Sequence, residues 1–319
     1  MLVERNLTRT IDPESLRVRR FQGQKLWVQD GYRLEPGFIA ALDGSRESIP
    51  GQVDFADAPD DACAAIDRWA RDATAGRIPS FMGHPDALSP VTRAIVTGVT
   101  CLEARWAESF PQRATRDEPF LCLDGSRVSV PTMHCVAQLG AAVDDDVHVV
   151  EIPYHNPDLV LDLIVPRPGR FEAVDQVMSM AYVFLLLGEL DHQTVVDLRL
   201  PRIAMQSDLR LGETLAALGA GEVFSTSADF TALSGEPGFH LDDVRHRTLF
   251  AVDEHGTGVE ALTMPTIGAA GPTGAARSGG SGGPGDPLQL RIDRPFFFLV
   301  RDVPSNSILL FGLCANPGV

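Results

Sequence analysis

Apolar and polar positions alternate with a period of two, or form short continuous apolar runs, in many segments of the chain. Both patterns are typical of β-strands, half-buried in the first case and covered on both faces in the second. Asn156-Pro157 is a turn signal inside one segment, and Pro201 interrupts another. We therefore predict strands within residues 24–31, 51–55, 92–106, 146–166, 194–206, 245–256, 290–302 and 307–313.

A helical period appears between these strands. Residues 60–78 show it most clearly, because Ala65, Ile66, Trp69 and Ala73 recur at helical spacing. Acidic residues open this segment and Gly76 follows it, as the helix dipole and C-cap chemistry prefer. We predict helices within residues 34–42, 60–78, 171–190 and 208–219, the last closed by Gly219.

Long strands and scattered helices follow one another without a βαβ rhythm, and we find no internal repeat. This order favours an α+β fold over a doubly wound sheet. Residues 268–287 are rich in Gly, Pro and Ser and interrupt the pattern close to the C-terminus. The chain then returns to a very apolar run, so we predict an exposed loop between two buried strands.

The composition limits the class of protein. The 319 residues are 44% hydrophobic, which suits one large domain or two ordinary ones. The net charge of −16 argues against nucleic acid or anionic lipid as a partner. One basic run, Arg17–Lys25, is interpreted as a solvated face or strand edge. The N-terminus has no apolar signal region, and no apolar run is long enough to predict a membrane span.

Residues suited to catalysis or metal binding do not form a recognisable constellation. The five cysteines are odd in number and lack CxxC spacing, so we predict buried, reduced thiols with neither zinc nor disulfides. His84 and the His134-Cys135 pair are isolated, and no HExxH or P-loop motif occurs. We therefore expect no enzyme activity, no metal and no cofactor. His246 stands apart because it lies on an apolar strand.

The stretch LRIDRPFFFLV, with SILLFGLCANP after it, resembles the C-terminal signature of the serpin family. Further blocks match in the family's order across residues 24–319. They are VDF, AIDRWARDATAGRI, AIVTGVTCLEARWAESF, EIPYHNPDLVLDLIVP and LPRIAMQSDLRLGETLAALGAGEVFSTSADFTAL. The resemblance implies one serpin-like domain over 1–319, with mixed and antiparallel sheets A, B and C, surrounding helices and a reactive-centre loop at 254–287.

The beginning of the chain departs from this pattern. Residues 1–23 match no family block, and the N-terminal helical layer has no counterpart. We expect that the start lies upstream, that the chain is a fragment, or that it recruits a partner. The compartment stays open: extracellular if the true N-terminus is missing, and otherwise cytoplasmic.

The resemblance implies that a monomer inhibits a serine-type protease as a suicide substrate. The protease would cleave the loop, form an acyl-enzyme, and be trapped as the loop inserts into sheet A. Family spacing points to the bond Ala270–Gly271, suited to an elastase- or subtilisin-like enzyme. Arg277–Ser278 is the alternative bond and would suit a trypsin-like one. The alternatives are a non-inhibitory serpin-like binding protein that is cleaved as a substrate, and a truncated, inactive serpin.

The hinge of the loop must be able to enter a sheet. Glu254, Gly256 and Thr257 match the family's hinge. If Thr257 points inward, period-two alternation sends Val259, Ala261 and Thr263 inward and places Glu260 on the solvent side. Pro265 opposes complete insertion because it lacks an N–H. The loop is also longer than the family pattern.

Three more positions match the family's switch regions. Trp106 corresponds to the breach. We expect an ion pair between Arg202 and Glu254 beside it, either as a breach contact or as a plain structural salt bridge. His246 corresponds to the shutter histidine. Its usual Asn partner falls on Gly98, so the family's hydrogen bond cannot form in the same way.

Overall fold

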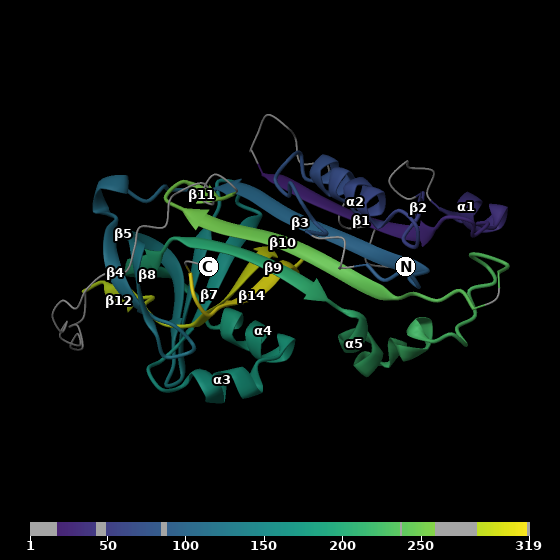
Figure 1. The fold of residues 1–319 in the computed structure, drawn as a ribbon. Helices are drawn as coiled ribbons and strands as arrows, with labels where there is room; N and C mark the ends of the chain where they lie inside the picture. The colour runs from purple at the N-terminus through teal and green to yellow at the C-terminus, as the bar shows by residue number, and fades with distance from the viewer. Residues whose placement is uncertain (1–17, 43–48, 84–87, 237, 259–285, 318–319) are drawn as a thin grey trace. The chain divides into compact units, whose positions relative to one another are not determined.

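The structure is a computed structural model that describes residues 18–42, 49–83, 88–236, 238–258 and 286–317. The described chain divides into two compact units (Figure 1). The first contains residues 103–205 and 250–317, with residues 18–19, and the second contains residues 20–102 and 206–249. The prediction of one domain over 1–319 stays a prediction, and each unit is described by itself.

The two sheets of the described chain have different topologies. In the six-stranded sheet the order is β2-β1-β3-β11-β10-β9. In the eight-stranded sheet the order is β12-β8-β5-β6-β7-β13-β14, and β4 also pairs with β5. The strands of the first sheet are β1 (Arg19–Gln29), β2 (Gly51–Val53), β3 (Ala94–Arg105), β9 (Ile203–Arg210), β10 (Asp243–Asp253) and β11 (Gly256–Thr257). Those of the second are β4 (Arg116–Leu121), β5 (Arg127–Val143), β6 (Val147–Pro153), β7 (Leu159–Pro166), β8 (Asp191–Pro201), β12 (Leu288–Arg291), β13 (Phe296–Asp302) and β14 (Ser307–Cys314).

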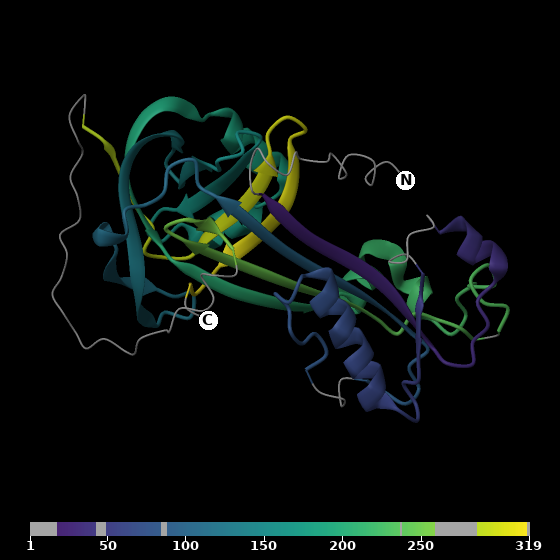
Figure 2. The same ribbon diagram turned by 90° about the horizontal axis from the view of Figure 1, so that it is seen from above.

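The second unit is built on the strands β1, β3 and β10. Residues 95–101 of β3 pair in parallel with residues 243–249 of β10. Helix α2 (Pro59–Ala73) lies alongside β1 (Figure 2). Gly23 permits this approach, because a Cβ there would lie 3.0 Å from the Ala73 Cβ. The unit also holds α1 (Pro36–Ala41), α5 (Gly212–Leu215) and the turns Ala216–Ala220 and Gly221–Phe224.

Helix α2 follows the sequence prediction closely. Asp60 and Asp61 occupy its first turn, and Gly76 follows its end with a φ of 86°, a conformation that glycine adopts without strain. The buried face is made of Ala62, Cys63, Ile66 and Ala70, whereas Trp69 is half-buried. Amphipathic spacing was therefore sufficient to place this helix.

The first unit has its core on the eight-stranded sheet. The side chains from Phe296 to Arg301 on β13 are all buried, and β13 pairs antiparallel with β7 and with β14. Helices α3 (Phe171–Val177) and α4 (Met180–Gly188) contribute Val174, Val183 and Leu186 to the same apolar cluster. The short turn Gln112–Ala114 lies before β4. The predicted antiparallel pairing of the last two strands is confirmed.

Some elements differ from the prediction. The helix predicted over 171–190 is two helices, because Ser179 begins α4 anew and its hydroxyl accepts from Tyr182 N at 3.3 Å. Residues 208–210, predicted as helix, end strand β9 instead. The segment 290–302 is divided, and β12 pairs in parallel with β8. Strands β4 and β5 were missed; β5 pairs with β4, β8 and β6 within the eight-stranded sheet.

All five cysteines lie in the described chain as free thiols, and Cys135 alone among them is only half-buried. Among the described residues we find no group of three or more His, Cys, Asp or Glu side chains that could hold a metal ion. In the same residues no single helix has both the length and the apolarity to cross a membrane. The bent pair α3 and α4 meets that test only by length and composition.

Candidate functional site

The predicted hinge forms a tight reversal at the end of β10. The Asp253 carboxylate accepts hydrogen bonds from His255 N at 2.7 Å and from Gly256 N at 3.2 Å. The chain then runs back along β10, with Val252 opposite Thr257 and Asp253 opposite Gly256. Gly258 N donates to the Ala251 carbonyl at 2.9 Å and continues the ladder. Gly256 and Thr257 are thus already in strand conformation, whereas Glu254 lies in the turn.

The other edge of β11 pairs with β3. Gly256 lies opposite Arg105 and Thr257 lies opposite Ala104, both in antiparallel register. β11 therefore has a strand on each side and is an interior strand of the sheet, although it is only two residues long. Beyond its end, in the second unit, the same two strands pair directly with each other from Ile95 to Cys101.

The backbone of Gly256 lies very close to the backbone of β3. A Cβ at this position would lie 2.0 Å from the Ala104 carbonyl oxygen and 2.8 Å from the Arg105 Cα. Both obstacles are backbone atoms, which cannot rotate away. The φ of 155° is also rarely adopted by residues with a side chain. Only glycine allows β11 to pair here with β3.

Glu254 is anchored in the reversal by its side chain, which is 2% exposed. Arg202 Nη2 and Nε donate to its carboxylate at 2.7 and 3.0 Å, and Thr115 Oγ1 donates at 2.5 Å. Burial by itself would raise the pKa of Glu254. The hydrogen bonds from Arg202 and Thr115 outweigh burial, so the pKa lies below its usual value. The ion pair expected from the sequence is present.

Trp106 joins the reversal to the turn between β6 and β7. Its Nε1 donates to the Asp253 carbonyl at 2.8 Å, and its backbone N donates to the His255 carbonyl at 3.0 Å. Its ring stacks on Tyr154, with centroids 4.6 Å apart. The Tyr154 hydroxyl in turn hydrogen-bonds Thr257 Oγ1 at 2.6 Å, and burial raises the Tyr154 pKa. Thr257 points inward and is 5% exposed.

His246 lies on β10 in the second unit, directly opposite Gly98 on β3. A Cβ on Gly98 would lie 2.5 Å from His246 Nδ1, so the ring occupies the space that a side chain at position 98 would need. Burial lowers the pKa of the half-buried imidazole and favours its neutral form. Gly98 therefore offers His246 no side chain to bond, and the His246 ring fills the space beside it.

The structure brings together Trp106, Arg202, Glu254, Gly256 and Thr257, all in the first unit. His246 belongs to a different unit. The reactive-bond candidates Ala270, Gly271, Arg277 and Ser278 lie outside the described residues, as does Pro265. Tyr154 and Thr115 were missed. Each lies more than a hundred positions from its hinge partner, and no local pattern connects them.

Comparison with known proteins gives a consistent result. The family model described as Serpin (serine protease inhibitor) matches residues 5–317, and so begins before residue 24. An uncharacterized serpin-like protein of Thermococcus kodakarensis is 28% identical over 292 residues, 92% of this chain and 65% of the relative. The leukocyte elastase inhibitor of Bos taurus is 28% identical over 303 residues, 92% of this chain and 76% of the relative.

Solved structures of the same fold are more distant in sequence. Human thyroxine-binding globulin superposes with a TM-score of 0.80 at 23% identity, over 97% of this chain and 77% of the other. Uncleaved ovalbumin superposes with a TM-score of 0.80 at 18% identity, over 98% of this chain and 76% of the other. These likenesses confirm the predicted α+β fold. The chain spans between 65% and 77% of the length of these four proteins.

Proposed function

The chain belongs to the serpin family, whose model is described as a serine protease inhibitor, and we propose that it inhibits a serine-type protease as a suicide substrate. The target cleaves the loop, its serine forms an ester with the loop carbonyl, and the freed loop extends β11 between β3 and β10. In this proposal the inhibitor acts as a monomer and supplies no catalytic residue. The cleaved bond is Ala270–Gly271 or Arg277–Ser278.

One observation supports this proposal above the others: β11 is antiparallel to both of its neighbours. A strand that continued from Thr257 would have the correct direction to pair with β3 on one side and with β10 on the other. To extend it, the seven direct pairs between residues 95–101 and 243–249 must separate. The new strand would gain on the order of ten backbone hydrogen bonds, each worth roughly 0.5–1.5 kcal/mol net. Extension is therefore energetically reasonable.

The contacts around Glu254 and Thr257 fit the role of a hinge. They fix the point at which the loop leaves the sheet, and they set the register of any residue that follows. Because Thr257 points inward, each second residue after it would also point inward. Small or β-branched residues occupy those positions in the sequence, whereas Glu260 falls on the other face.

A second function is supported by two specific features. Pro265 lacks the N–H that an interior strand needs, and Gly98 offers His246 no side chain to bond. Both disfavour complete insertion. The protein would then be a non-inhibitory serpin-like protein that proteases cleave as an ordinary substrate.

The deciding experiment incubates the protein with trypsin, elastase and subtilisin separately and analyses each mixture on a denaturing gel. Inhibition gives a band at the summed mass that survives SDS, and sequencing the released peptide identifies the bond. Thr257→Arg should abolish that band and leave cleavage, because a buried guanidinium beside Tyr154 opposes insertion. Leu209→Arg adds the same charge at an exposed strand position and should leave the band unchanged. Cleavage without the band for the unmodified protein would establish the second function.

A further inference from the structure

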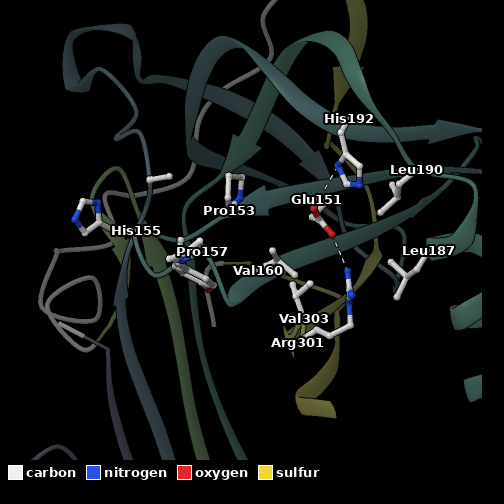
Figure 3. Close-up of a pocket in the computed structure, with 12 residues that line it drawn as sticks. Glu151, Pro153, His155, Pro157, Val160, Leu187, Leu190, His192, Arg301 and Val303 are labelled. Carbon is white, nitrogen blue, oxygen red and sulfur yellow. Dashed lines mark hydrogen bonds and ion pairs between the residues drawn. The ribbon is translucent and has the colours of Figure 1, made fainter. Parts of the chain in front are cut away.

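A second feature of the first unit is a pocket of about 430 Å³ beside the β6–β7 hairpin (Figure 3). Its walls come from β6, β7 and the turn between them, from the end of α4 and the start of β8, and from the end of β13. The lining residues are Ala107, Glu151, Pro153, Tyr154, His155, Pro157, Val160, Leu187, Leu190, His192, Arg301 and Val303. None of the contacts described for the hinge requires this cavity.

The floor of the pocket is a buried charged group. Arg301, which is 7% exposed, donates from Nη2 to Glu151 at 2.7 Å and from Nε to Asp162 at 2.9 Å. Asp162 is fully buried beneath it. Burial raises the pKa of Asp162 to about 6, against the hydrogen bonds from Arg301, so at neutral pH this carboxyl is mostly ionised.

The charges in this group do not balance. Glu151 and Asp162 carry two negative charges, and Arg301 carries one positive charge. The guanidinium binds Glu151 through Oε2. The other oxygen, Oε1, lies 3.6 Å from His192 Nδ1, which is too long for a hydrogen bond and gives an ion pair only when the imidazole is protonated. Figure 3 shows Glu151 between these two side chains, in the middle of the labelled residues. One carboxylate oxygen is therefore left for a further donor.

The rest of the lining is mainly apolar. Leu187 and Leu190 lie on one side of Glu151 in Figure 3, and Val160 and Val303 lie below it. A carboxylate in such surroundings attracts a cation more strongly than it would in water, because fewer water molecules compete. An anion would meet the excess negative charge, and a neutral apolar molecule would leave Glu151 Oε1 without a donor.

We propose that this pocket binds a small organic cation, a primary amine or guanidinium that carries an apolar body. The cationic group donates to Glu151 Oε1, with the exposed His192 imidazole beside it. The apolar body packs against Leu187 and Leu190. This arrangement satisfies the free oxygen, neutralises the excess charge and buries apolar surface together.

The site is also adjacent to the hinge. Tyr154 lines the pocket, stacks on Trp106 and hydrogen-bonds Thr257. A ligand in the pocket thus rests against the residue that fixes the first inward side chain of β11. Any effect of the ligand on loop insertion rests on the proposed function, whereas binding itself does not.

The test measures binding of phenethylamine to the whole chain by titration calorimetry, near neutral pH in an amine-free buffer. Phenethylamine is expected to bind at least about tenfold more tightly than 2-phenylethanol or phenylacetate, which keep the ring and change the charge. Glu151→Gln should weaken phenethylamine binding by about tenfold and leave 2-phenylethanol binding unchanged. Glu172→Gln, the same change at an exposed position on α3, should have no effect.

Leu187→Trp provides a second variant that fills the pocket without altering Arg301 or its carboxylates. It should abolish phenethylamine binding, and a thermal melt confirms that the variant folds. Equal binding of the amine and the alcohol, or undiminished binding by both pocket variants, would overturn the proposal. No protease is present in this assay, so failure of the inhibitory function leaves its result unaffected.

Discussion

Arg202 and Glu254 form a two-pronged ion pair in which the carboxylate is 2% exposed and the guanidinium 22% exposed. Arg202 follows the end of β8, and Glu254 follows the end of β10. The pair therefore connects the eight-stranded sheet to the reversal from which the loop departs. The ion pair thus fixes the position of Glu254, two residues before β11 begins.

Arg202→Met should destabilise the protein by roughly 2–3 kcal/mol, because it leaves a buried carboxylate with Thr115 as its remaining hydrogen-bond donor. Arg202→Met combined with Glu254→Gln should recover part of that loss, since the uncompensated charge is gone. Urea denaturation measures both. The control Arg170→Met removes an exposed pair with Asp146 and should change stability by no more than about 1 kcal/mol. A loss at Arg202 as small as the control's would show that the pair is not structural.

Gly256→Ala should destabilise the start of β11, because its Cβ would overlap the Ala104 carbonyl oxygen. We expect a loss of several kcal/mol, or the release of β11 from β3 with faster amide exchange at Thr257. Hydrogen exchange and urea denaturation distinguish these outcomes. Gly37→Ala in α1 is the matched control; its Cβ would meet nothing within 4 Å, and helix propensity favours alanine by about 1 kcal/mol. Normal exchange and stability in Gly256→Ala would contradict the steric argument.

Gly98→Ala should cost roughly 1–3 kcal/mol, because its Cβ would lie 2.5 Å from His246 Nδ1 and would force the half-buried ring to move. His246→Ala removes the obstacle, so the double variant should be more stable than the sum of the two single changes predicts. A double-mutant cycle in urea measures this coupling. Additive effects would mean that the ring moves freely and that the two positions do not interact.

Local patterns in the sequence were enough for much of the fold. Helix α2 and strands β3, β6 and β7 follow from periodicity and turn residues, and the resemblance to serpins predicted the ion pair between Arg202 and Glu254. Strand β5 was not predicted because Pro131 interrupts the alternation of apolar and polar residues along it. The partnerships of Glu254 with Thr115 and of Thr257 with Tyr154 join residues far apart in the chain. Such contacts depend on strand order and register, which no local pattern specifies.

Asp162 should make stability depend on pH in a predictable direction. Its folded-state pKa of about 6 lies above the unfolded value of 3.8, so folding favours its protonated form. The resulting stabilisation is complete below pH 3.8 and is lost as the pH rises through about 6. Asp162→Asn lacks this titration, so the difference in unfolding free energy between it and the unmodified protein should change by on the order of 3 kcal/mol between pH 4 and pH 7. Urea denaturation at several pH values measures the difference. Asp117→Asn, at an exposed strand position, should track the unmodified protein across the range. If Asp162→Asn also tracks it, the buried carboxyl titrates normally and Arg301 compensates fully for its burial.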